Sequence, residues 1–243
     1  MVDAPSIALG IVGTALPFYL ALTLFQAQSL RKHAQVVLAL ATGMSVYFLL
    51  DGFVDSGELG VTIGYYGGWQ PLELIAAFAL TFVILQSLRR KPEYAWPLWV
   101  VALGISVHSF AEAHDLAAAA NLYFSNLSAI LPSAISFLLH KFLEGFALVA
   151  AAVVTGAKGL KQVLLAGTPM IVIAVLGSLA NFVTFDLSPI IAAGVGGWAL
   201  VTLILATHFE RPTKPTIFAL VALAFVIVYA ASLLHYTGVV QGP

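Results

Sequence analysis

The sequence predicts an all-α integral membrane protein, built as a bundle of eight transmembrane helices with both termini outside the cytoplasm. Hydrophobic residues make up 61% of the 243 residues and charged residues only 9%, whereas a soluble domain carries about 25% charged residues. The mean hydropathy of +1.01 agrees with this class. Because no polar region is large enough for a soluble domain, we expect residues 1–243 to form a single transmembrane domain.

Apolar runs long enough to cross a bilayer recur along the chain. A bilayer core needs about 20 apolar residues in a helix, and polar or turn-rich stretches separate runs of about that length. The residues before the first run lack the basic segment of a signal peptide, so we expect this run to be retained as a helix. The expected spans are residues 5–28, 34–51, 71–88, 96–120, 130–155, 163–185, 188–207 and 215–237.

The basic residues sort to one side of this expected bundle. Nine of the ten Lys and Arg residues lie in the first, third, fifth and seventh links, while the other links carry Asp55, Glu58 and Asp186 without Lys or Arg. Cytoplasmic loops are enriched in Lys and Arg, so we expect the basic side to be cytoplasmic and both termini to face outward. The nine residues are Arg31, Lys32, Arg89, Arg90, Lys91, Lys158, Lys161, Arg211 and Lys214.

Two consecutive spans carry ionisable side chains, although the other spans are nearly free of charge. The stretch VHSFAEAHD contains His108 and Glu112, and the stretch LLHKFLEG contains His140, Lys141 and Glu144. Residues four apart lie one turn apart on the same face of a helix, so each His–Glu pair is expected to share a face. At a rise of about 1.5 Å per residue, both histidines fall near the middle of the bilayer.

We expect these two faces to meet and form a single metal site. Consecutive spans joined by a short link run antiparallel, which brings two imidazoles and two carboxylates to one depth. This ligand set suits Zn²⁺ first, with Fe²⁺, Mn²⁺, Co²⁺ and Cd²⁺ as alternatives, and the chain has no cysteine for a Cu(I) site. Asp115 lies one turn beyond Glu112 and is a further candidate ligand, whereas His114 points away from that face.

The two stretches together resemble the paired signatures of the ZIP (Zrt-, Irt-like) family of divalent metal transporters. Helices four and five of that family typically read H-S-x-x-E-G and H-K-x-x-E-[AG], and this chain has HSFAEA followed by HKFLEG. The resemblance implies the same eight-helix arrangement with outward termini. The residues that match the transport-site ligands of the family are His108, Glu112, His140 and Glu144.

The resemblance also gives roles to residues outside these four. Asp51 and Asp55 in LLDGFVDS match an acidic stretch near the outer entrance of some members, where carboxylates would concentrate cations; an ordinary solvated helix end is the alternative. In members that bind two metals, the residues after the two histidines add ligands, and here these are Ser109 and Lys141. An ammonium repels a second cation, so we expect one metal, with Lys141 as the substitute charge that bridges the two glutamates.

The function that the resemblance implies is transport of a divalent cation into the cytoplasm by alternating access, without enzyme activity. The expected location is the cell (plasma) membrane, and the expected partners are the lipid bilayer and the metal ion, with a homodimer as an open alternative and no nucleic acid. We expect no organic cofactor, and the chain contains no G-x-x-x-x-G-K-[ST] motif for a nucleotide. The chain departs from the family at AHDLAAAA, which stands where members usually show a sequence such as G-L-A-L-G.

Other classes of membrane protein remain as alternatives. A haem-binding electron-transfer subunit would use His108 and His140 as axial ligands, but it would leave Glu112 and Glu144 beside an apolar cofactor. An intramembrane metallohydrolase could use a metal and a glutamate base, yet no H-E-x-x-H motif occurs. A retinal protein is disfavoured because the last span contains no lysine.

Overall fold

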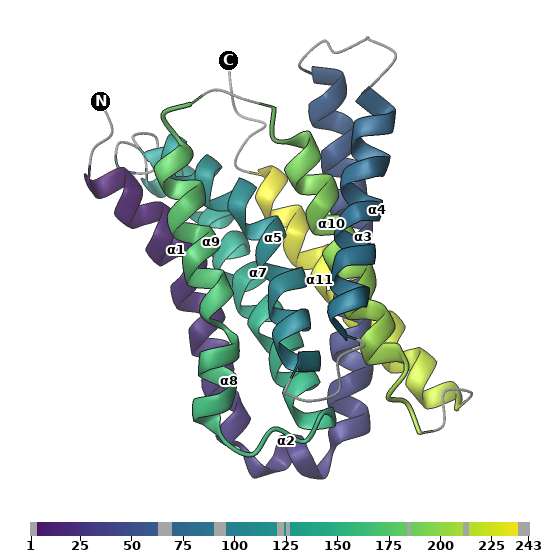
Figure 1. The fold of residues 1–243 in the computed structure, drawn as a ribbon. Coiled ribbons are helices and arrows are strands. Elements are labelled where there is room, and N and C mark those ends of the chain that lie inside the picture. The colour runs from purple at the N-terminus through teal and green to yellow at the C-terminus, as the bar shows by residue number, and fades with distance from the viewer. Residues whose placement is uncertain are drawn as a thin grey trace.

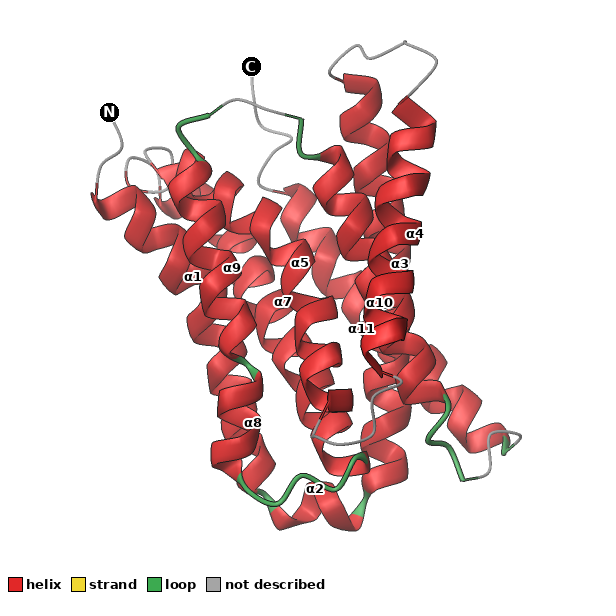
Figure 2. Ribbon diagram, in the orientation of Figure 1, coloured by secondary structure: helices red, strands yellow, loops and turns green. Residues whose placement is uncertain are grey.

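A computed structural model describes residues 4–62, 70–89, 96–120, 124, 127–183, 186–210 and 214–237. Within these ranges the regular structure is helical (Figures 1 and 2). The elements are α1 (Ala4–Leu22), the 3-10 helix η1 (Thr23–Gln26), α2 (Gln28–Lys32), α3 (Ala34–Thr62), α4 (Gln70–Arg89), α5 (Trp96–Ala118), α7 (Leu127–Val154), α8 (Leu160–Ala166), α9 (Thr168–Ala180), α10 (Ser188–Ala206) and α11 (Pro215–Thr237).

Six helical segments in the described residues are long and apolar enough to cross a membrane, which confirms the predicted all-α membrane class. Of the other expected spans, α4 has a shorter apolar part, Leu72–Leu88. Helix α5 is less apolar because it carries His108, Glu112, His114 and Asp115. The six segments are Ala4–Gln26, Ala34–Ser56, Leu131–Val154, Leu160–Ala180, Ser188–Ala206 and Pro215–Leu233.

Two of the expected spans differ most from the helices of the structure. The span expected to end at residue 51 continues as α3 to Thr62, so the polar stretch after it begins as helix rather than as a link. An α-helix satisfies its own backbone groups and tolerates polar residues outside the lipid. The span expected at 163–185 is divided into α8 and α9 at Gly167, and α9 ends at Ala180. Pro169 lies in the first turn of α9, where its missing N–H costs nothing.

Helix α10 lies at the centre of the packing and positions the helices around it. It packs against α3, α4 and α5, while α5 also packs against α9, α1 against α7, and α11 against α3. The backbones of α10 and α5 meet at glycines: a Cβ atom added to Gly197 would lie 2.2 Å from the Gly104 carbonyl oxygen. A Cβ atom added to Gly194 would lie 2.7 Å from the Cα atom of His108. The central helix therefore fixes the backbone of α5 at the level of His108.

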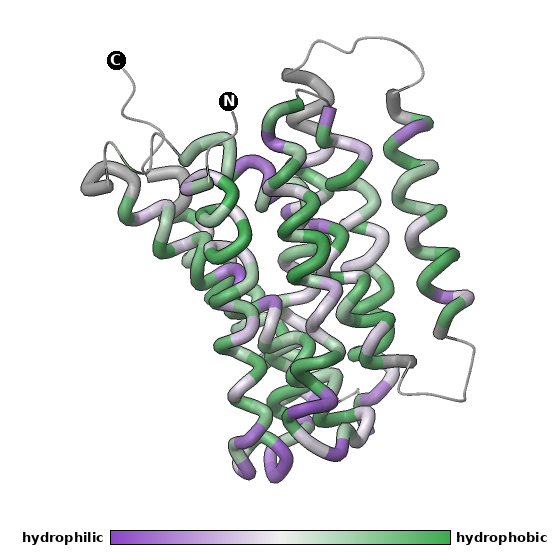
Figure 3. Tube along the Cα trace, turned by 60° about the vertical axis from the view of Figure 1, so that its left-hand side comes forward, coloured by the Kyte–Doolittle hydropathy of each residue, from purple (hydrophilic) through white to green (hydrophobic). Residues whose placement is uncertain are grey.

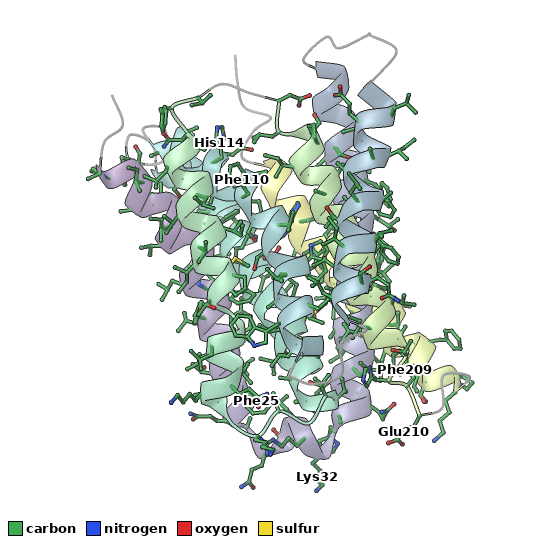
Figure 4. The ribbon with its side chains drawn as sticks, viewed as in Figure 1. Phe25, Lys32, Phe110, His114, Phe209 and Glu210 are labelled. Carbon is green, nitrogen blue, oxygen red and sulfur yellow. The ribbon has the colours of Figure 1, made fainter. Side chains whose placement is uncertain are left out.

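Basic residues of α2 mark one end of the bundle. Helix α1 begins and α11 ends at one end, and α2 lies at the opposite end (Figure 1). Arg31 and Lys32 form the last turn of α2, and Figure 4 shows Lys32 at that end and His114 near the other. Hydrophilic segments gather at the α2 end, while most of the helical length is hydrophobic (Figure 3). Gly156, with φ of +72°, ends α7 there in the left-handed conformation that favours glycine.

Candidate metal centre

Helices α5 and α7 bring the two predicted His–Glu pairs into one group. Ligand atoms of His108, Glu112, His140 and Glu144 all lie within 4.8 Å of one another. His140 Nε2 lies 3.3 Å from Glu112 Oε1 on the other helix and 3.2 Å from Glu144 Oε1 on its own. His108 Nε2 lies 3.8 Å from Glu112 Oε1. The spacing of four residues within each helix produces this convergence, because it places the two side chains of each pair on one face.

The side chain of Lys141 lies between the two carboxylates. Its Nζ contacts Glu112 Oε2 and lies 2.8 Å from Glu144 Oε2. It also donates a hydrogen bond of 2.9 Å to Ser109 Oγ, and this hydroxyl donates to Glu144 Oε2 at 3.4 Å. Lys141 and Glu144 have exposed fractions of 0%. A charge removed from water to this degree is tolerated only when it is paired and hydrogen-bonded.

In each glutamate, the two carboxylate oxygens contact different partners. The Oε2 atoms face the ammonium of Lys141, and the Oε1 atoms face the imidazoles. Two imidazole nitrogens and two carboxylate oxygens therefore remain on one side as potential ligands. In a tetrahedral zinc site with bonds of about 2.0–2.1 Å, neighbouring ligand atoms lie about 3.4 Å apart. The two contacts of His140 Nε2, at 3.2 and 3.3 Å, are close to this separation.

The four-residue group and Lys141 together carry a net negative charge that a cation can balance. Two carboxylates and one ammonium sum to a negative charge when both imidazoles are neutral, as metal ligation requires. A divalent ion on the Oε1 side would face this excess without displacing Lys141 from the Oε2 side. Such a site favours one ion, because a second cation on the Oε2 side would meet the ammonium.

Aromatic rings cover one side of the group. The Phe48 ring of α3 lies 4.4 Å from the His140 ring, measured between centroids, and 4.8 Å from the Trp198 ring of α10. The His108 and His140 rings are nearly parallel, at 20° and 6.1 Å. Nδ1 of His108 is buried and has no hydrogen-bond partner among the described residues. A metal-ligating histidine usually donates its second ring N–H to an acceptor, and the His108 ring lacks this support among the described residues.

The remaining predicted residues lie outside the four-residue group. Asp115 Oδ1 lies 2.9 Å from His114 Nδ1, and the Asp115 side chain is 61% exposed. The predicted roles of Asp115 as a ligand and of the two acidic residues at the entrance stay predictions. Asp51 accepts a hydrogen bond of 2.9 Å from the Tyr47 hydroxyl, and Asp55 is half-buried near the end of the apolar part of α3.

Two contributors to the site were missed by sequence reasoning. Phe48 and Trp198 are apolar residues within apolar spans, so no sequence pattern distinguishes them from ordinary core residues. The sequence also does not show that Gly194 of α10 meets the backbone of His108. Only the packing of α3 against α7 and of α10 against α5 reveals these contacts.

Fold and site together define a helical membrane protein with a buried His/Glu group that could bind a metal ion. No protein-family model and no curated protein matches the sequence.

Proposed function

We propose that this protein is a divalent metal cation transporter of the ZIP type, which carries Zn²⁺ into the cytoplasm through one His/Glu site. Fe²⁺, Mn²⁺, Co²⁺ and Cd²⁺ are the alternative substrates. The observation that carries the proposal is the convergence of His108, Glu112, His140 and Glu144 within 4.8 Å inside a membrane bundle. Intramembrane ionisable groups generally mark ion or substrate pathways.

The proposed topology has eight spans and outward termini. Each expected span overlaps at least one helix of the structure. In the proposed topology, α4 and α5 also cross the membrane and, with the six long apolar segments, give eight spans. The basic turn of α2 lies at the end opposite to the start of α1. The positive-inside rule then makes the α2 end cytoplasmic, and transport toward that end is uptake. The cell membrane and the homodimer stay predictions.

In the proposed mechanism the four ligand groups replace part of the water around the ion. The Oε1 atoms of the two glutamates and the Nε2 atoms of the two histidines bind it, while Lys141 keeps the Oε2 atoms paired whether or not the ion is present. Without that ammonium, the empty site would hold two buried carboxylates close together, which is costly in a low dielectric. Lys141 thereby allows the protein to release its cargo and remain folded.

The haem alternative fits this geometry less well. Axial ligation by His108 and His140 would place an iron and its flat macrocycle between the two imidazoles. The Oε1 atoms of Glu112 and Glu144 already lie 3.3 and 3.2 Å from the Nε2 atom of His140 in that space. A visible absorption spectrum of the purified protein distinguishes the two, because a Soret band would support haem and contradict the transporter.

Metal uptake into proteoliposomes tests the proposal. The purified parent should take up Zn²⁺ in competition with Fe²⁺, Mn²⁺, Co²⁺ and Cd²⁺, and His140→Ala and Glu144→Gln should each reduce uptake at least about ten-fold, since both remove a ligand. His208→Ala and Glu73→Gln are matched controls, because both residues lie outside the four-residue group. Parental uptake by both site variants would contradict the assignment of the site, and no uptake by the parent would contradict the function.

A further inference from the structure

Phe48 belongs to a helix that contributes no member of the four-residue group, yet its ring touches one of them. It lies on α3 with 1% of its surface exposed. Its ring centroid is 4.4 Å from that of His140 on α7, with the planes tilted by 44°. Contact at this distance means that the His140 ring cannot turn toward α3 unless the Phe48 ring moves first.

The His140 ring needs such support more than the other ligand groups do. Its side chain is 19% exposed, compared with 7% for His108, 15% for Glu112 and 0% for Glu144. Its Nε2 also makes the two shortest imidazole–carboxylate contacts of the group. Rotation of this ring would therefore break the contact between His140 on α7 and Glu112 on α5.

The Phe48 ring also packs against aromatic rings other than His140. Trp198, which is fully buried on α10, lies 4.8 Å away between ring centroids. Tyr47 packs edge-on against Phe48 at 5.7 Å and against Phe225 of α11 at 5.8 Å. Two aromatic neighbours, Trp198 of α10 and Tyr47 of α3, therefore restrict the Phe48 ring, and Phe225 of α11 in turn packs against Tyr47.

We infer that Phe48 is a positioning residue that holds the His140 imidazole in the orientation required for metal binding. The inference rests on the proposed metal site. Phe48 has no ligand atom, so it acts only by restricting the rotation of His140 before the ion arrives. Holding a ligand in its bound orientation reduces the conformational cost of binding. It follows that α3 and α10 contribute to metal affinity although all four ligand groups come from α5 and α7.

The test is a double-mutant cycle on Zn²⁺ affinity, measured with the full chain in detergent by competition with chromophoric chelators. Phe48→Leu should weaken binding about ten-fold, at the lower end of what supporting residues around metal ligands contribute. Phe48→Tyr retains the ring and should stay within about two-fold. Phe82→Leu is the matched control, since Phe82 stacks on Phe78 of α4.

The His140→Ala background separates positioning from general packing. If Phe48 acts through His140, Phe48→Leu should change affinity less than about two-fold once His140 is absent; a weaker chelator keeps the lower affinity measurable. An equal loss in both backgrounds, an equal loss in Phe82→Leu, or full affinity in Phe48→Leu would each overturn the inference. These outcomes require a parent that binds Zn²⁺, whereas failure of the parent to bind contradicts the proposed function instead.

Discussion

The two His–Glu pairs have the same spacing in sequence but different surroundings in the structure. On α7, His140 Nε2 lies 3.2 Å from Glu144 Oε1 and the Phe48 ring packs against His140, while Lys141 contacts the glutamates of both pairs. On α5, His108 Nε2 lies 3.8 Å from Glu112 Oε1, and its Nδ1 has no partner among the described residues. The α7 pair is thus preorganised, whereas the α5 pair has freedom to adjust around an ion.

This difference shows that a repeated motif need not give two equivalent halves of a site. The H-x-x-x-E spacing sets the face of each helix, but neighbouring helices determine how firmly each side chain is held. Preorganised groups contribute more to binding because less conformational freedom is lost when the ligand arrives. We therefore expect the α7 pair to dominate metal affinity and the stability of the empty site.

The largest expected effect is that of Lys141→Met, which removes the charge that both carboxylates share. Glu144 is fully buried, so the loss of its partner leaves a buried charge uncompensated, at a cost of about 3–5 kcal/mol. The unfolding midpoint of the metal-free protein should fall, and Zn²⁺ should recover part of the loss. Thermal unfolding with and without Zn²⁺ measures this. An unchanged midpoint would show that Lys141 does not stabilise the empty site.

The same substitution on the two helices should have unequal effects. His140→Ala should weaken Zn²⁺ binding by more than about 100-fold, because it removes a preorganised ligand that contacts both glutamates. His108→Ala should weaken binding by about ten-fold, because His108 is the less firmly held group. Chelator competition measures both. Equal losses, or a larger loss in His108→Ala, would contradict the asymmetry.

Acid should weaken metal binding, and the α5 pair contributes part of this response. Both imidazoles must be neutral to bind the ion, so binding strengthens as pH rises and weakens as protons compete. Between about pH 7.5 and about pH 5.5, Zn²⁺ affinity should fall at least about ten-fold. His108→Ala should show a shallower dependence, since one competing proton is lost. A flat profile in the parent would show that the histidines do not bind the ion.

The smallest effect is expected for Asp115→Asn. Its carboxylate is largely exposed and pairs with His114, and it lies outside the four-residue group. Zn²⁺ affinity should therefore stay within about two-fold of the parent value, as for most exposed positions away from a site. A loss of Zn²⁺ affinity as large as that of His108→Ala would indicate that Asp115 is a metal ligand and that α5 contributes a third ligand to the site.

Much of the site was predictable because ionisable residues contrast sharply with apolar spans. The ionisable groups stand out by charge and spacing, and helical geometry places the two members of each pair on one face. These groups are His108, Glu112, His140 and Glu144. The contributions of Phe48 and other apolar neighbours were not predictable, because an apolar residue in an apolar span carries no signal of what it touches. Their roles depend on tertiary packing that the helical period does not specify.

The helix boundaries were also only partly predictable from the sequence. Hydropathy predicts where helices cross lipid, because every backbone polar group in the bilayer must be satisfied internally. It does not predict where a helix ends in water, and α3 accordingly continues to Thr62 beyond its expected end. Nor does it reveal the division at Gly167 between α8 and α9, since the hydropathy of the segment stays high across the break.

The most direct test is zinc K-edge X-ray absorption on the purified protein after loading with Zn²⁺. We predict one Zn²⁺ per chain, with a first shell of nitrogen and oxygen atoms at about 2.0 Å and the outer-shell signature of imidazole. The imidazole signature should weaken in His140→Ala and in His108→Ala. A parent that retains no stoichiometric zinc, or a spectrum unchanged in both variants, would contradict a metal centre shared by α5 and α7.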